Sequence, residues 1–265
     1  MHPGSLIDTD RYDLDDCALA ERCHRQFVDE GVCILPGFLR PEAMRSLVDE
    51  CRALEPLAFH SRSSSTPYLT QPDLSLPEGH PGRRVVHSSV EVVAYDQFPE
   101  SSPLRALYEW DPLTDFVRRC LGVAELHRYG DPFGALNLSV MREGDELCWH
   151  FDMADFVVSL AIQSSTFGGE FENAKQIRTP DADNFDSVSA VLDGRAPQLV
   201  RTEPMTPGTL MLFNGRWSMH RVTTIHGTDS RYVALLAYDT KPGTDSSDEL
   251  KLSRYGRLPG EKIQA

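Results

Sequence analysis

The chain has 265 residues, with 40 acidic and 26 basic side chains and a net charge of −14 at neutral pH. This length suits one all-β domain with added helices, and the acidic balance argues against nucleic acid or an anionic membrane surface as a partner. No stretch reaches the ~18 consecutive apolar residues that a membrane span requires. The start, Met1–Ser5, lacks the basic and apolar regions of a signal peptide. Six cysteines without Cys-x-x-Cys spacing are typical of reduced thiols, so we expect a cytoplasmic protein.

The N-terminal third predicts helices around one short strand. Residues 1–12 read as a flexible tail, and apolar positions at helical spacing predict a helix over Asp15–Glu30 that ends at Gly31. Val32–Leu35 predicts a strand, and Pro41 a second helix as its first residue. Ser102-Pro103 and Asp111-Pro112 each read as an N-cap followed by proline, giving two short helices before Gly122.

Residues 60–84 form a long polar segment rich in Ser, Pro and Gly, without a period of its own. Segments of this length are usually functional or disordered, so we interpret it as a lid loop. From about residue 124 to 240 the pattern is strands and turns, which we take as the core of a single domain spanning 1–265. An acidic insert at 173–197 interrupts it, with one helical turn expected near Asp186–Leu192.

The pair His150 and Asp152 suggests metal binding within this core. On a strand, residues i and i+2 share a face, whereas on a helix they point to nearly opposite sides. The alternating stretch Ala135–Met141 before them and Phe156–Ile162 after them favour strands. Both side chains are therefore expected on one face, with Phe151 on the other.

A third ligand is expected far along the chain, on a neighbouring strand. His220 lies 68 residues after Asp152 and directly follows the apolar stretch Thr209–Phe213. Two histidines and one carboxylate on a single ion form the facial triad of non-haem Fe(II) oxygenases. Arg231 lies 11 residues after His220, across a segment, 226–230, that reads as a hairpin turn. Its guanidinium would clamp the carboxylate of an anion that chelates the metal.

This ordered set resembles the iron and cosubstrate residues of the Fe(II)/2-oxoglutarate-dependent oxygenases. Gly168–Phe171 and the segment Pro207–Gly215 extend the resemblance, which covers roughly residues 14–256. Trp-His-Phe-Asp, Gly-Gly-Glu-Phe-Glu and His-Arg-Val-Thr are similar to a bacterial subgroup of free-amino-acid hydroxylases and lysine halogenases. The resemblance implies a mainly β protein with a double-stranded β-helix (jelly-roll, cupin-like) core, with N-terminal helices packed outside it. It also implies Fe(II), 2-oxoglutarate and O2.

Asp152 bears on the reaction within this subgroup. Halogenases of this type carry Gly or Ala at this position, which leaves a coordination site for chloride, so the resemblance implies hydroxylation. The expected substrate is a small free amino acid, basic or polar, oxidised at an unactivated C–H bond. A phytanoyl-CoA hydroxylase-like enzyme acting on a CoA- or carrier-bound acyl group stays the alternative, because Phe27–Phe38 resembles that branch too. Desaturation or cyclisation is also open.

Several further residues are candidates for the site, each with a plainer interpretation. Asn137 is a candidate to contact the cosubstrate carboxylate, or it is a satisfied strand amide. Arg84, preferred over Arg83, is a candidate for a substrate carboxylate, or a solvated loop charge. Trp149 is a pocket wall or a core residue, and Asp155 meets a substrate ammonium or belongs to a turn.

Two other classes of protein fit these residues less well. A binding or sensor protein on this fold is expected to lack a ligand or the arginine, and all four are present. A cupin enzyme without 2-oxoglutarate usually draws on more histidines and has no need of Arg231. The expected partner is a small molecule. A homodimer is compatible with the sequence, which leaves the oligomeric state open.

Overall fold

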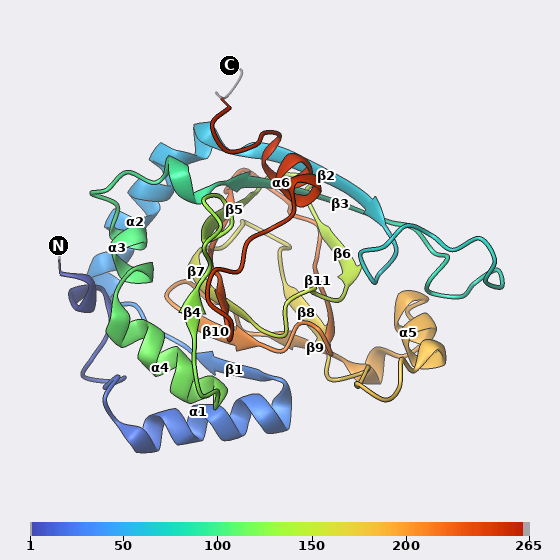
Figure 1. The fold of residues 1–265 in the computed structure, drawn as a ribbon, viewed down its shortest axis with the longest axis horizontal. Coiled ribbons are helices and arrows are strands. Elements are labelled where there is room, and N and C mark those ends of the chain that lie inside the picture. Colours follow the sequence, from blue (N-terminus) through green and yellow to red (C-terminus); the bar gives the residue numbers. More distant parts are fainter. Residues whose placement is uncertain (1, 262–265) are drawn as a thin grey trace.

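The computed structural model describes residues 2–261, and its centre is a barrel-like arrangement of two antiparallel sheets (Figure 1). Within that range the larger sheet runs β1 (Val32–Leu35), β10 (Leu210–Phe213), β7 (Val157–Gln163), β12 (Arg231–Leu236), β5 (Leu136–Met141), β3 (Val86–Val93) and β2 (Phe59–Ser65). The smaller sheet runs β6 (Leu147–His150), β11 (Met219–Val222), β8 (Phe171–Ala174) and β9 (Val200–Glu203). A short pair joins β13 (Tyr238–Asp239) and β4 (His127–Arg128). The expected jelly-roll core is confirmed.

Helices cover both flanks of this core. Figure 1 shows the N-terminal helices beside the larger sheet and α5 at the far side, beyond the smaller sheet. The α-helices are α1 (Cys17–Glu30), α2 (Pro41–Leu54), α3 (Pro103–Tyr108), α4 (Asp111–Leu121), α5 (Phe185–Leu192) and α6 (Asp248–Tyr255). Single 3-10 turns are η1 (Pro3–Leu6), η2 (Glu55–Leu57), η3 (Tyr95–Gln97) and η4 (Pro197–Leu199). No helix within residues 2–261 has the length and apolar character of a membrane span.

Side-chain alternation on the larger sheet separates an apolar outer face from a mixed inner face. The outward residues Leu138, Leu160 and Ala234 belong to the main core, which the N-terminal helices also enter. Inward Met141 belongs instead to a cluster shared with the smaller sheet. Because successive strand residues point to opposite faces, Asn137 and Ser139 share the inward face with Met141. The space between the two sheets is thus lined partly by small or polar side chains.

The helix signals in the sequence match the structure closely. Asp16 caps α1 by accepting a hydrogen bond from the Ala18 amide, and Gly31 ends it with φ +69°. Ser102 caps α3 in the same way, and α4 ends at Gly122, although Trp110 and not Asp111 occupies its N-cap. The expectation of a flexible tail over residues 1–12 is wrong, because several of these residues are buried against the core: Leu6, Ile7 and Tyr12. The apolar side chains of this segment are spaced too irregularly to indicate a helix, so the sequence did not predict that they pack on the core.

The expected lid over 60–84 also needs correction at its start. Residues 59–65 form β2, which pairs along its whole length with β3. This edge strand is rich in serine and mostly exposed, so it carries neither the alternation nor the apolar content that indicates a strand. The remaining connection, residues 66–85, projects toward α5 (Figure 1). The insert at 173–197 contains a helix at the expected place, α5.

Candidate active site

His150 and Asp152 stand at the end of β6, as the strand spacing predicted. His150 is the last residue of the strand, and Asp152 follows two residues later with its Oδ1 3.7 Å from His150 Nε2. Phe151 points the other way, into a buried cluster that also contains Trp149. The alternation of a strand therefore separates the two polar side chains from the aromatic ones on either side of His150.

His220 completes the group from the neighbouring strand. β11 pairs with β6 so that His220 lies opposite His150, and the centroids of the two imidazole rings are 4.2 Å apart. The Nε2 atom of His220 is 3.3 Å from Asp152 Oδ2. One ligand atom from each of the three residues lies within 4.8 Å of the other two, close enough for all three to bind one metal ion. Two imidazoles and one carboxylate are the donor set of the non-haem iron facial triad.

Backbone carbonyls orient both imidazoles. The Nδ1 atom of His150 donates to the carbonyl of Cys148 at 2.7 Å, and Nδ1 of His220 donates to that of Ser218 at 3.0 Å. Each ring therefore directs the Nε2 lone pair toward the shared centre, as metal-ligating histidines do. Burial, and secondly the nearby His220, lowers the pKa of His150 to about 4. Neutral imidazole is the form that binds metals.

Gly215 fixes the position of Asp152. The carbonyl of Gly215 accepts a hydrogen bond from the Asp152 amide at 3.0 Å. A Cβ atom at residue 215 would stand 1.8 Å from Asp152 Oδ2, a distance that no side chain tolerates. Phe171 and Phe213 pack on the ring of His220, with centroids 5.5 and 4.8 Å away. The Gly-Gly-Glu-Phe and Pro207–Gly215 segments thus contact the metal ligands, a role for Gly215 that the sequence did not indicate.

Arg231 reaches the barrel by a different route from the predicted hairpin. β11 and β12 lie in different sheets, so residues 223–230 cross between sheets, and the interpretation of 226–230 as a hairpin turn is wrong. Arg231 instead pairs with Met141 of β5, which places its side chain on the inward face. Gly169 lies beside it, and a Cβ atom there would be 2.9 Å from Arg231 Cδ.

The Arg231 guanidinium is buried without an anionic partner. The residue is 7% exposed, and its side chain's recorded hydrogen bond is a 4.0 Å contact from Nη1 to Met141 Sδ. Among residues 2–261 no acidic side chain forms an ion pair with it. Burial lowers the pKa of Arg231 to about 10, so it keeps its charge at neutral pH. A buried cation without an acidic partner in the described range fits a site for an anionic ligand, because such charges otherwise cost several kcal/mol.

Asn137 lies on the inward face, but its amide already has partners. Its Nδ2 donates to the carbonyls of Phe133 and Leu136, and its Oδ1 accepts from the Tyr255 hydroxyl at 2.9 Å. The proposed contact to a cosubstrate stays a prediction that requires one of these bonds to break. The buried hydroxyl of Ser159 has no hydrogen-bond partner among residues 2–261.

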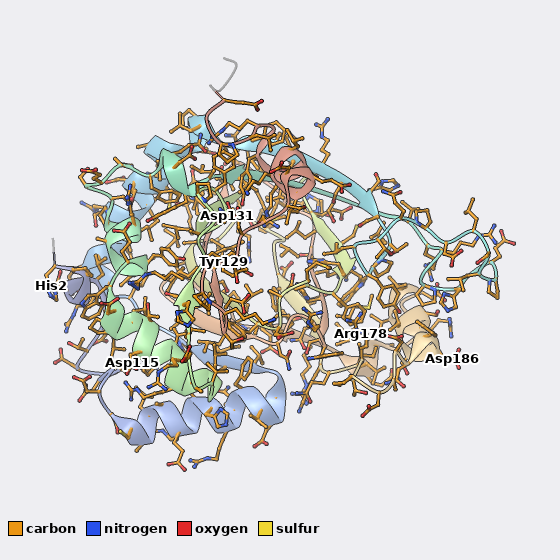
Figure 2. The ribbon with its side chains drawn as sticks, viewed as in Figure 1. His2, Asp115, Tyr129, Asp131, Arg178 and Asp186 are labelled. Atoms are coloured by element: carbon orange, nitrogen blue, oxygen red, sulfur yellow. The ribbon has the colours of Figure 1, made fainter. Side chains whose placement is uncertain are left out.

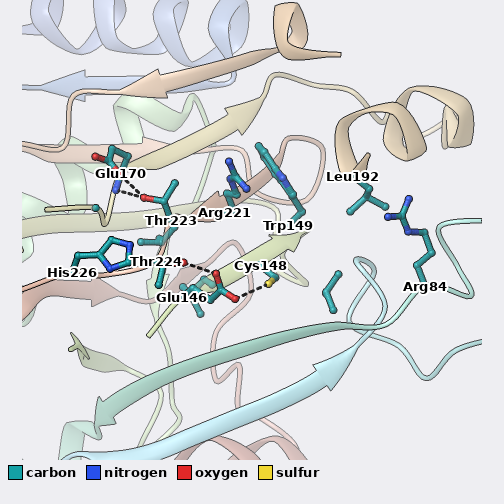
Figure 3. A pocket seen from close by; sticks show the side chains of 14 residues that line it. Arg84, Glu146, Cys148, Trp149, Glu170, Leu192, Arg221, Thr223, Thr224 and His226 are labelled. Carbon is teal, nitrogen blue, oxygen red and sulfur yellow. Dashed lines mark hydrogen bonds between the residues drawn. The ribbon is translucent and has the colours of Figure 1, made fainter. Parts of the chain in front are cut away.

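Arg84 and Trp149 line a pocket that is separate from the triad (Figure 3). This outer pocket has a volume of about 540 Å³ and lies between β6, β11 and the end of α5, and none of the three triad residues lines it. Arg84 forms an ion pair with Asp193 at 2.5 Å, and Trp149 stacks on the Arg221 guanidinium. The structure therefore does not bring these two residues together with the metal ligands. Their substrate roles stay predictions.

Asp155 follows the ligand segment but faces solvent. Its side chain is 71% exposed and forms an ion pair with Arg216. Tyr129, which the sequence did not indicate, lies nearer the centre of the strands (Figure 2). Burial raises the pKa of Tyr129, and Asp152 is among the carboxylates that raise it further.

Solved structures with the same fold are Fe(II)/2-oxoglutarate oxygenases. The epimerase SnoN from nogalamycin biosynthesis, in complex with Fe3+, alpha ketoglutarate and nogalamycin RO, matches with a TM-score of 0.60 at 17% identity, over 94% of this chain and 93% of that one. The carbocyclase SnoK of the same biosynthesis matches with a TM-score of 0.56 at 17% identity, over 93% and 95%. A 2OG-Fe(II) oxygenase family oxidoreductase from Burkholderia pseudomallei gives 0.53 at 16% identity, over 85% and 92%.

At the level of sequence, no curated protein matches the chain. The family model described as Halogenase D matches residues 15–252, which include the triad, Arg231 and most of α6. That match spans far more than half of the 265 residues. The chain therefore belongs to the Halogenase D family and has the jelly-roll fold of the 2-oxoglutarate–Fe(II) oxygenases.

Proposed function

We propose that this protein is an Fe(II)- and 2-oxoglutarate-dependent dioxygenase that hydroxylates a small free amino acid. The observation that carries the proposal is the combination of a three-residue metal group with a buried, unpartnered guanidinium in the same barrel. A metal group alone fits many hydrolases and binding proteins. The added requirement for an internal anion narrows the choice to enzymes whose metal works with a carboxylate cosubstrate.

The chain's own residues have distinct tasks in this proposal. His150, Asp152 and His220 would hold the iron, and Arg231 would bind the distal carboxylate of 2-oxoglutarate by charge-assisted hydrogen bonds. With iron, 2-oxoglutarate and O2 bound, the site would oxidise an unactivated C–H bond while 2-oxoglutarate becomes succinate and CO2. One oxygen atom enters the substrate and the other enters succinate, so the reaction balances. The apolar rings of Phe171 and Phe213 pack on the His220 ring and would shield that ligand from water.

Asp152 supports hydroxylation over halogenation, although the family is described by a halogenase. A halide ligand needs a coordination position, and here a carboxylate stands within 3.7 Å of both imidazoles. Hydroxylation therefore needs no change in the ligand set. Replacing Asp152 with glycine removes that ligand, and Asp152→Gly should suppress hydroxylation. Traces of chlorinated product in high chloride would fit an opened coordination position.

The choice of an amino-acid substrate is supported by the motif resemblance and by the acidic protein, whose net charge of −14 favours neutral or cationic small molecules. Solved structures of the same fold include an epimerase and a carbocyclase. Fold alone does not assign a reaction. Epimerisation, desaturation and cyclisation are accordingly outcomes for the assay to separate.

The test is succinate release from the iron-loaded protein with each of the twenty amino acids, together with mass spectrometry of the amino acid. We expect one or a few to stimulate succinate release and to gain one oxygen atom. His220→Ala serves as the inactive control, since it lacks a metal ligand. Stimulation by a CoA thioester or carrier-bound acyl group, with none of the amino acids active, would instead establish the acyl substrate class. A mass lower by two hydrogens would indicate desaturation or cyclisation.

A further inference from the structure

The C-terminal helix α6 carries a cation that has no ion-pair partner among residues 2–261. Lys251 forms an ion pair with Asp245 at 2.7 Å, and Arg257, just beyond the helix, forms two hydrogen bonds to Asp96 at 2.7 and 2.8 Å. Arg254 lies between them. Within residues 2–261 its side chain forms no hydrogen bond or ion pair, and its Nε atom is buried without a partner. A desolvated guanidinium donor left without an acceptor is costly unless a ligand supplies one.

Contacts on either side of Arg254 hold it near the interior of the barrel. The next residue, Tyr255, donates from its hydroxyl to Oδ1 of Asn137, on the inward face of β5. The preceding residue, Ser253, accepts a hydrogen bond at its carbonyl from the Ser61 hydroxyl of β2 at 2.9 Å. Tyr255 also packs edge-on against Phe133, with ring centroids 5.4 Å apart. The position of Arg254 is thus fixed by the larger sheet and does not depend on a loose terminus.

The interior face beside Arg254 is the one that carries Arg231. Asn137, which bonds Tyr255, shares the inward face of β5 with Met141, and Arg231 pairs with Met141. Two guanidiniums without an anionic partner among residues 2–261, Arg231 and Arg254, therefore lie along one inner face. 2-Oxoglutarate has one carboxylate that is not needed for chelating the metal, and Arg231 is the more deeply buried of the two. A second anionic group, from another ligand, would supply the acceptor that the buried Nε atom of Arg254 lacks.

We propose that Arg254 binds the carboxylate of the substrate. The inference rests on the proposed dioxygenase function and narrows it to substrates with a free carboxylate beside the reacting carbon chain. An acyl group linked as a thioester has no such carboxylate, so Arg254 also separates the two substrate classes.

Other arginines on that side of the molecule are already engaged. Arg84 is paired with Asp193 and lines the outer pocket. Arg178 lies toward α5 (Figure 2), where its guanidinium stacks on Phe151 at 4.7 Å and is 3.8 Å from Asp183. Phe151 points away from the metal ligands, so Arg178 is on the wrong face of β6 to meet a substrate at the iron.

The experiment measures binding of carboxylates to the anaerobic protein loaded with Fe(II) and 2-oxoglutarate, through the change in its visible charge-transfer absorption. The probes are the twenty amino acids, their carboxamides, and a set of simple carboxylates from butyrate to octanoate. In the wild type we expect acids to bind and the matched amides to bind weakly. Arg254→Gln should weaken the best acid by roughly 10- to 100-fold, the range for a lost hydrogen bond to a charged group. Its amide should be unaffected.

Two further variants separate binding from structure. Arg254→Lys keeps the charge and should recover part of the affinity for the acid. Arg257→Gln removes a charge of the same sign three residues away, and should lower the melting temperature without changing the preference for acid over amide. The apparent constant for 2-oxoglutarate should be the same in wild type and Arg254→Gln.

The inference is overturned if no probe in the panel binds the wild type more tightly than Arg254→Gln, or if the loss in Arg254→Gln appears in the 2-oxoglutarate constant. Failure of the proposed function is a different result. The protein would then form no charge-transfer band with Fe(II) and 2-oxoglutarate, in wild type and variants alike.

Discussion

Arg231 carries its charge inside the barrel, where it is 7% exposed and has no acidic partner among residues 2–261. This arrangement has opposite consequences for the free and the ligand-bound protein. In the free protein the charge is desolvated, so Arg231→Met should increase the free energy of unfolding by about 1–4 kcal/mol. In the complex the same substitution removes a charge-assisted pair worth on the order of 2–5 kcal/mol. The apparent constant for 2-oxoglutarate should then rise at least ~30-fold.

Denaturant unfolding of the metal-free protein and titration with 2-oxoglutarate measure the two effects of Arg231→Met separately. Arg231→Lys keeps a positive charge without the bidentate fork and should lie between wild type and Arg231→Met in affinity. If Arg231→Met binds 2-oxoglutarate as tightly as the wild type, the anchoring group is another residue.

Gly215 sets the position of a metal ligand purely by having no side chain. A Cβ atom at this position would overlap Asp152 Oδ2 at 1.8 Å. We therefore expect Gly215→Ala to bind iron with an affinity reduced by tenfold or more, about 1.4 kcal/mol, while the sheets stay folded. Gly82→Ala is the matched control, because its added Cβ meets the flexible Leu76 side chain at 3.0 Å in an ordinary backbone conformation. Stoichiometric iron in Gly215→Ala would contradict this reading of the contact.

The sequence predicted the metal ligands because they follow a local rule. His150 and Asp152 are two residues apart on a strand, and their shared face follows from the strand period. His220 and Arg231 followed from an ordered motif. Gly215 and Arg254 followed from neither. Their roles depend on tertiary contacts with distant segments. Gly215 lies against Asp152, and Arg254 lies near the interior beside Asn137. No spacing along the chain predicts such contacts.

Among the elements, the 66–85 connection and α5 form one aromatic unit next to the metal ligands. Tyr68 stacks on Phe151 at 5.4 Å and meets Phe185 of α5 edge-on at 6.2 Å. The Phe151 amide donates to the carbonyl of Pro67 at 2.8 Å. Residues 66–85, which include most of the expected lid, are thus attached to Phe151, the residue between two metal ligands.

Tyr68 provides a test of this unit. Its hydroxyl is buried without a hydrogen-bond partner in the part of the chain that the structure describes, and burial raises the pKa of Tyr68 to about 12. Tyr68→Phe keeps both ring contacts and removes only that hydroxyl, so it should be neutral or slightly stabilising. Tyr68→Leu loses the ring pairs and should cost about 1 kcal/mol or more, with faster limited proteolysis between residues 66 and 85. Equal proteolysis rates for the two variants would mean that the rings do not hold the connection in place.

Elements were predictable where their signals are local. Caps and terminal glycines marked α1, α3 and α4 to within a residue or two. The segment 226–230 has the composition of a hairpin turn, yet it links strands of different sheets, because turn chemistry specifies a reversal and not the sheet that receives the next strand. The mostly exposed, serine-rich β2 is held in place by pairing with β3. The residues of β2 alone do not predict this strand.

At the scale of the whole molecule, the ligand sites join the two sheets. The metal ligands belong to the smaller sheet and its flanks, whereas Arg231 belongs to the larger one and α6 packs on β2 of the larger one. A metal with a chelating 2-oxoglutarate would therefore bridge the sheets and supply an anionic partner for Arg231, and the substrate carboxylate would supply one for Arg254. Ligands that bind only the folded state stabilise it in proportion to the logarithm of their concentration over the dissociation constant.

We accordingly expect stepwise thermal stabilisation of the whole chain. With each ligand at 100 times its dissociation constant, anaerobic Fe(II) should add about 2.7 kcal/mol, or roughly 5–10 °C in melting temperature for a chain of this size, and 2-oxoglutarate should then add a comparable step. 2-Oxoglutarate without metal should add much less, since it loses the chelating contact. Arg231→Met should keep the metal step and lose the second, and His220→Ala should lose both. Full stabilisation of His220→Ala by Fe(II) and 2-oxoglutarate would place the metal at other residues.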